Sequence, residues 1–161
     1  MKKLKEGFVA VLLVIVGMII TLISVPVIII SAPSYYFRRI KFLKRYAHFL
    51  EQNNGQNYFC YNNKKNLKEF IELEIIPELD EKISIIYLNG KHVETDTSSK
   101  EFISNALYNL RNYSKFPHLM KIRNGKIIDS SVNALAYGVK NQKKSKEHFI
   151  AKIDDFFDFK N

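Results

Sequence analysis

The chain has 161 residues, a single cysteine, four histidines and a formal net charge of +9. A single cysteine excludes an intramolecular disulfide, and without a cysteine pair or suitably spaced histidines the sequence offers no zinc site. No glycine-rich phosphate-binding motif is present, so we expect neither a nucleotide nor another cofactor, nor a metal.

The positive charge is concentrated near the N-terminus. Residues 1–7 contain three lysines and one glutamate, and residues 31–45 contain five basic and no acidic side chains. The remaining residues, 46–161, hold 17 basic and 15 acidic side chains, which nearly cancel. Because the excess flanks an apolar segment, where it can meet lipid headgroups, nucleic-acid binding is not expected.

Residues 8–30 (FVAVLLVIVGMIITLISVPVIII) form an uncharged run of 23 residues. A helix of about 20 such residues spans the hydrocarbon core of a bilayer, whereas the apolar part of a cleaved signal peptide is about 7–15 residues long. We therefore expect residues 1–33 to be an uncleaved anchor in the lipid bilayer. Five basic residues after the run against three before it favour a cytoplasmic C-terminal part, although the three lysines of the short N-terminal tail argue the reverse.

The segment 34–57 is expected to be a basic amphipathic helix followed by a polar linker. Its apolar residues follow a helical spacing from Phe42 to Leu50, and Asn53-Asn54-Gly55 is typical of a turn. A simple stem helix with solvated charges fits the same pattern. The aromatic and basic side chains at the start of the segment are typical of a membrane interface: Tyr35, Tyr36, Arg38, Arg39, Lys41, Lys44 and Arg45.

Two strand-and-helix pairs follow. Residues 58–61 (YFCY) predict a strand, and Asn66 with Glu69 three residues later predicts the start of a helix that runs towards Pro77. The nearly continuous apolar run 83–88 (ISIIYL) is typical of a strand covered on both faces.

The last part of the chain predicts a helix, a hairpin and a helix. Ser98 and Glu101 form a second capping box before an amphipathic stripe. Asn124-Gly125 lies between two short apolar runs and favours a hairpin with a type I′ turn. The apolar spacing from Phe149 to Phe157 predicts a terminal helix.

The expected order is strand, helix, strand, helix, hairpin, helix, and this α/β arrangement resembles the thioredoxin fold. Phe116-Pro117 precedes the hairpin, where thioredoxin-like proteins carry a cis-proline beside the active site. Residues 76–81 (IPELDE) look like the proline-bearing first helix of that family. The resemblance covers about 58–157, so we expect a thioredoxin-like domain at 58–161.

A thioredoxin-like enzyme needs a thiolate at the start of its first helix. The corresponding loop, residues 62–66, contains no cysteine, and Cys60 lies earlier, within the expected strand. The resemblance is therefore to a redox-inactive member of the superfamily, with Cys60 as a buried apolar residue. The loop and the proline would then remain as a binding surface, made of Lys64, Lys65, Phe116, Pro117 and His118.

We accordingly expect a single-pass, membrane-anchored binding or scaffold module for another membrane-associated protein, rather than an enzyme. Two alternatives remain open. One is a monothiol oxidoreductase that uses Cys60 against small thiols or mixed disulfides. The other is a structural accessory subunit that acts through its transmembrane helix.

Overall fold

The computed structural model describes residues 2–90, 92–94, 99–142 and 144–159. The chain divides into two compact units, Met1–Arg45 and Tyr46–Asn161. The first unit is helical from Lys2 onward, and the second contains a mixed sheet with helices on both faces.

The first unit consists of most of helix α1, which runs from Lys2 to Gln52 and contains Pro26 and Pro33. From Val9 to Ile29 the large apolar side chains that the structure describes are exposed, up to 77% for Leu22. Among the described residues the structure has one helix, α1, that is long and apolar enough to cross a membrane, as the uncharged run predicted. Tyr35 and Tyr36 follow that run and are also exposed.

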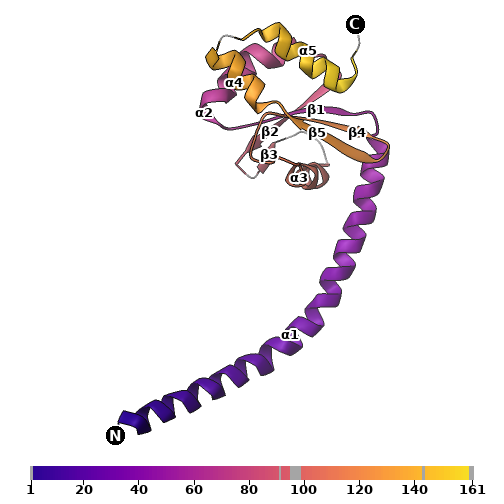
Figure 1. Cartoon of the computed structure of the whole chain (residues 1–161). Helices are drawn as coiled ribbons and strands as arrows, with labels where there is room; N and C mark the ends of the chain where they lie inside the picture. Colours follow the sequence, from indigo (N-terminus) through magenta and orange to yellow (C-terminus); the bar gives the residue numbers. More distant parts are fainter. Residues whose placement is uncertain (1, 91, 95–98, 143, 160–161) are drawn as a thin grey trace. The chain divides into compact units, whose positions relative to one another are not determined.

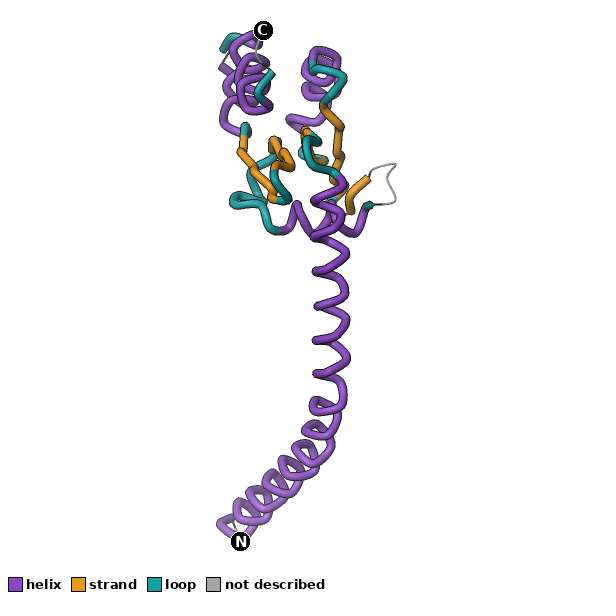
Figure 2. The backbone as a smooth tube through the Cα atoms, turned by 90° about the vertical axis from the view of Figure 1, so that its right-hand side faces the viewer, coloured by secondary structure: helices purple, strands orange, loops and turns teal. Residues whose placement is uncertain are grey.

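The second unit is built on a five-stranded sheet (Figures 1 and 2). Its strand order is β3-β2-β1-β4-β5. The central pair β1 and β2 is parallel, and every other neighbouring pair is antiparallel. The strands are β1 (Asn57–Asn62), β2 (Ile83–Asn89), β3 (His92–Glu94), β4 (His118–Arg123) and β5 (Lys126–Ser131).

Helices cover both faces of this sheet. Figure 1 shows α2, α4 and α5 on one face and α3 on the other, and in Figure 2 the helices nearest the C-terminus lie to one side of the strands. The bounds are α2 Lys65–Phe70, α3 Lys100–Tyr108, α4 Asn133–Gln142 and α5 Lys146–Phe157. After α2 the chain continues as a π-helical turn, η1 (Ile71–Ile75), and a 3₁₀ turn, η2 (Ile76–Glu78).

Each face has its own apolar core because successive strand residues point to opposite sides. On β1, Tyr58 and Cys60 belong to the core on the α3 side, whereas Phe59 and Tyr61 belong to the core beneath α2 and α5. The strand β2 likewise contributes to both cores, with Leu88 on the first side and Ile83 on the second. This confirms the prediction that residues 83–88 form a strand covered on both faces.

The α3-side core also includes the last turns of α1. Phe49 and Leu50 are 5% and 8% exposed, and the Phe49 ring stacks on Phe102 with 5.1 Å between ring centroids. The compact unit therefore begins at Tyr46, before residue 58, where the sequence placed its start. Apolar residues that the sequence assigned to a juxtamembrane helix cover the sheet instead.

The polar residues 53–56 form a turn fixed to the hairpin of β4 and β5. The Gly55 amide donates to the Ile122 carbonyl (2.9 Å), and the Ile122 amide donates to the Gln56 carbonyl (3.0 Å). The Asn124 amide donates to Asn54 Oδ1 (2.8 Å). A segment expected as a linker is thus an integral part of the domain.

The hairpin agrees with its prediction. Asn124 and Gly125 have φ values of 52° and 67°, so both adopt the left-handed conformation that a type I′ turn requires. The terminal helix over 149–157 is also found, within α5.

The helix starts are less well predicted. Helix α2 begins at Lys65, one residue before the expected cap Asn66, and has no side-chain cap. Helix α3 begins at Lys100, and the expected cap Ser98 lies outside the described residues.

Candidate functional site

The carboxyl ends of the parallel strands β1 and β2 meet at one edge of the sheet, where open α/β sheets commonly bind ligands. Asn62 ends β1, Asn63 follows it, and Asn89 ends β2. Asn63 Nδ2 donates to Asn89 Oδ1 at 3.2 Å. Asn89 Nδ2 in turn donates to Glu94 Oε1 on β3, also at 3.2 Å. Hydrogen bonds through the exposed amide groups of Asn63 and Asn89 therefore join the loop after β1 to the edge strand β3.

Lys64 and Lys65 extend this edge towards the loop that precedes β4. Both side chains are exposed. Lys64 Nζ donates to the carbonyl of Ser114 at 3.3 Å, which brings the β1–α2 loop beside the residues that lead to Pro117. Within the described part of the chain neither lysine pairs with a carboxylate. Both lysines are therefore exposed, as expected from the sequence, and their contact with a partner stays a prediction.

The other three residues of the expected surface are buried, and their assignment to the surface is corrected. Phe116 and His118 are 3% and 0% exposed, and Pro117 is buried as well. Phe116 packs in the α3-side core, with its ring edge-on to Tyr113 at 5.7 Å between ring centroids. His118 is already the first residue of β4, a strand with a neighbour on each side, so no solvent reaches it. The Phe116–Pro117 peptide bond is cis.

His118 is held in a defined orientation. Its Nε2 lies 2.8 Å from the carbonyl of Asn112, so Nε2 carries the proton and donates. Nδ1 is then an acceptor, and it has no hydrogen-bond partner among the described residues. The nearest carboxylate oxygen, Asp129 Oδ2, lies 3.7 Å away and is itself an acceptor.

Burial decides the charge of this imidazole. It lowers the pKa of His118 below 6.5, against the opposing effects of the Asn112 carbonyl and of Asp129. The ring is therefore neutral at neutral pH. A buried ring of this kind cannot exchange protons with a bound substrate, so His118 contributes to the core.

Cys60 is equally enclosed. It is 0% exposed in the central strand, and burial raises the pKa of its thiol well above the usual range. A protonated thiol without access to solvent is a poor nucleophile. This confirms the prediction that Cys60 is a buried residue of the strand.

The expected membrane-interface residues all lie on α1, in the first unit. Arg38, Arg39, Lys41, Lys44 and Arg45 are exposed, as are Tyr35 and Tyr36. The Arg39 guanidinium lies 5.6 Å from the centroid of the Phe42 ring. Their contact with lipid headgroups stays a prediction. For metals, the described residues contain no group of three or more histidine, cysteine or acidic side chains suited to hold an ion.

Sequence reasoning did not identify the amide chain at the sheet edge. Its signal was present, because asparagines end or follow two predicted strands, at 62–63 and at 89. Connecting them required the parallel pairing of β1 with β2, in which Asn62 is the register partner of Leu88.

Comparison with known proteins finds no protein family, no curated protein and no solved structure that matches this chain.

Proposed function

We propose that this protein is a single-pass membrane protein whose domain is thioredoxin-like, redox-inactive and used for binding. The element order supports the fold. A βαβ unit (β1, α2, β2) is joined by α3 to the β4–β5 hairpin, and α5 closes the domain. The chain departs from the expected pattern in the short edge strand β3 and the additional helix α4.

The burial of the single thiol carries the proposal that the domain binds rather than catalyses. Thioredoxin-like enzymes place their reactive cysteine at the start of the first helix, where it is exposed and its pKa is lowered. In this protein Lys64 precedes that helix, while Cys60 lies inside the sheet with a raised pKa. The place of the reactive thiol is thus taken by exposed cationic side chains.

The partner we propose is another membrane-associated protein that presents acidic side chains to Lys64 and Lys65. Long-range attraction between opposite charges speeds the encounter of two proteins held in the same membrane. We further propose that the domain faces the cytoplasm, because more basic residues follow the apolar run than precede it.

Affinity purification of the intact protein from membranes tests this function. Proteins recovered with the wild type are quantified against the double variant Lys64→Glu/Lys65→Glu. A double variant Lys126→Glu/Lys152→Glu makes the same change in net charge at exposed positions on β5 and α5. We expect the first variant to lose its partner by about tenfold or more and the control to retain it. Equal recovery with both variants contradicts the proposal.

The same experiment separates the accessory-subunit alternative. In a further variant the apolar run is replaced by a leucine span of equal length, which keeps the domain anchored. Loss of the partner from this variant alone, with full recovery by the lysine variant, would assign the function to the transmembrane helix instead of the domain.

A further inference from the structure

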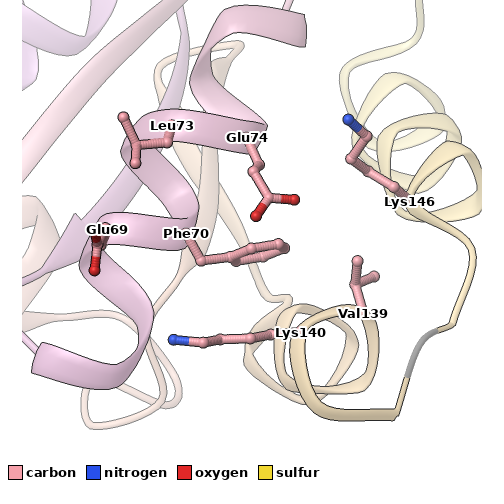
Figure 3. A pocket seen from close by; sticks show the side chains of 7 residues that line it. All are labelled: Glu69, Phe70, Leu73, Glu74, Val139, Lys140 and Lys146. Carbon is pink, nitrogen blue, oxygen red and sulfur yellow. The ribbon is translucent and has the colours of Figure 1, made fainter.

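A pocket of about 500 Å³ lies between the helix pair α2–η1 and the helix pair α4–α5. Figure 3 shows Glu74 and Lys146 projecting from its two walls, and their opposite charges attract each other. Glu69 and Lys140 add one further charge of each sign to the lining. The pocket is therefore electrically balanced, and its charge selects no class of ligand.

Two other segments of the second unit, residues 62–66 and 109–115, contain no acidic residue. Lys64 Nζ in the first segment donates to the Ser114 carbonyl in the second at 3.3 Å, so the two segments lie side by side. Together they carry four exposed basic side chains: Lys64, Lys65, Arg111 and Lys115. Among the described residues none of the four forms an ion pair with a carboxylate. The charge of this surface is therefore positive and uncompensated.

The second of these segments is fixed to the sheet. The Asn112 carbonyl accepts hydrogen bonds from the Lys115 amide and from His118 Nε2, both at 2.8 Å. The Ser131 hydroxyl donates to the Lys115 carbonyl at 2.6 Å. Because these bonds hold the backbone that carries Arg111 and Lys115, a partner would meet a preformed surface and lose little free energy in ordering it.

An exposed aromatic ring adjoins these basic side chains. Tyr108 ends α3 and is 52% exposed, and its ring stacks on Tyr113 with 5.2 Å between ring centroids and 17° between ring planes. Tyr113 lies edge-on to Phe116, which belongs to the α3-side core. Tyr113 also directly precedes Ser114, whose carbonyl Lys64 contacts. The exposed ring is thus supported from the core, and such rings commonly anchor protein interfaces.

Carboxylates limit the extent of the positive surface. Glu94 accepts a hydrogen bond from Asn89, which accepts one from the residue before Lys64. Glu69 follows Lys65 by one helical turn. A nucleic-acid strand that ran past the two segments would meet these carboxylates, whereas a short acidic segment of a protein would meet only the basic side chains between them.

The basic-aromatic surface consists of five exposed residues: Lys64, Lys65, Tyr108, Arg111 and Lys115. We propose that it binds a short acidic segment in which carboxylates flank a large apolar side chain. The carboxylates pair with the basic side chains, and the apolar side chain covers the Tyr108 ring. This inference rests on the proposed function and specifies the segment that the partner presents. An acidic segment without the apolar side chain leaves Tyr108 uncovered, and a basic segment is repelled.

Fluorescence anisotropy on the full chain in a non-ionic detergent tests the proposal with three labelled peptides. The first is Gly-Glu-Glu-Phe-Glu-Glu-Gly, the second has serine in place of phenylalanine, and the third has lysine in place of every glutamate. The first two peptides have the same charge, so the net charge of +9 attracts both equally. We expect the phenylalanine peptide to bind at least about tenfold more tightly than either of the others.

Variants of Tyr108 locate the apolar contact. Tyr108→Ser should weaken binding of the phenylalanine peptide by about tenfold, whereas Tyr108→Phe keeps the ring and should bind as the wild type does. Ile128→Ser is the matched control, because it removes an exposed apolar side chain on β5, and it should also bind as the wild type does.

A double variant locates the charged contact outside Lys64 and Lys65. Arg111→Glu/Lys115→Glu should weaken binding of the phenylalanine peptide by about tenfold. The control Lys126→Glu/Lys152→Glu makes the same change in net charge at exposed positions on β5 and α5. It should lose no more than about twofold at physiological ionic strength, where charges more than about 8 Å away are largely screened.

Three results would overturn the proposal. They are equal affinity for the phenylalanine and serine peptides, wild-type affinity in the Tyr108→Ser variant, and tighter binding of a short oligothymidylate than of the phenylalanine peptide.

Affinity purification with the same variants separates this inference from the proposed function. If Lys64→Glu/Lys65→Glu loses the membrane partner while Tyr108→Ser and Arg111→Glu/Lys115→Glu retain it, this inference fails and the proposal of an acidic partner stands. If all three variants retain the partner, both fail.

Discussion

Cys60 on β1 lies directly opposite His118 on β4 in the antiparallel register, and both side chains are 0% exposed. Residues opposite each other in an antiparallel pair point to the same face. The thiol and the imidazole therefore both occupy the α3-side core. The thiol and the imidazole are thus enclosed together, which supports the proposal that this domain binds rather than catalyses.

The buried imidazole makes stability depend on pH. Burial lowers the pKa of His118 in the folded state, so between that value and about 6.5 the unfolded chain binds more protons than the folded one. The contribution of the neutral His118 side chain to the free energy of unfolding is complete above about pH 6.5 and is lost as the pH falls through the lowered pKa. We expect the melting temperature to fall between about pH 7.5 and 5.5.

Circular dichroism of the full chain in detergent, recorded across that pH range, measures the effect. The variant His118→Gln keeps a donor for the Asn112 carbonyl but cannot titrate, so its profile should be flatter. If the melting temperature of the variant depends on pH as steeply as that of the wild type, another group and not His118 causes the loss of stability.

Lys121 fixes the end of α5 to the sheet. Its Nζ donates to the Phe156 carbonyl at 2.5 Å and to Asp158 Oδ2 at 2.7 Å, and the side chain is 12% exposed. Lys121→Met keeps the apolar stem but removes the ammonium group that donates to both acceptors. We expect it to lower the free energy of unfolding by about 1–2 kcal/mol in denaturant titrations.

Lys152 of α5 supplies the control for this measurement. Its pair with Asp155 is 3.4 Å long and exposed, so Lys152→Met should change stability by no more than about 0.5 kcal/mol. Equal losses in the two variants would contradict the role given to Lys121.

The proposed anchor predicts how the protein fractionates. It should remain in the membrane pellet after washing with high salt or alkaline carbonate, because the apolar residues of α1 hold it in the bilayer. A protein attached only through its basic residues 38–45 would be released, since salt screens such contacts. Release of the wild type by salt alone would contradict the anchor.

The proposed orientation predicts protection from protease. Protease added outside intact cells should leave residues 46–161 undigested, and the same domain should be digested once the membrane is permeabilised. Digestion in intact cells would place the domain outside and the N-terminal lysines on the retained side.

Much of the fold was predictable because its signals are local. The strands over 58–61 and 83–88, the Asn124-Gly125 turn and the terminal helix follow from apolar spacing and turn chemistry in short windows. Strand β3 was not predicted, since three residues are too few for a periodic pattern. Helix α4 was missed as well, because its sequence NALAYGVKNQ places a glycine and polar residues within a short apolar stripe.

The site was less predictable because burial depends on the whole fold. A histidine after a proline was expected at the surface, yet His118 has Cys60 on one side and Ser131 on the other through strand pairing. Lys64 and Lys65 are exposed as expected, since Lys64 lies in the loop after β1 and Lys65 is the first residue of α2. The pocket between α2–η1 and α4–α5 required knowledge of a helix that the sequence did not reveal.

The reactivity of Cys60 tests most directly whether the domain binds or catalyses. The thiol of the folded protein at neutral pH should react with a maleimide at least about a hundredfold more slowly than the thiol of the urea-unfolded chain, because reactivity follows exposure and the thiolate fraction. Cys60→Ser should be destabilised by about 1–2 kcal/mol yet retain its partner. Rapid labelling of the native thiol, together with a stable serine variant that has lost biological activity, would contradict this account and favour a monothiol oxidoreductase.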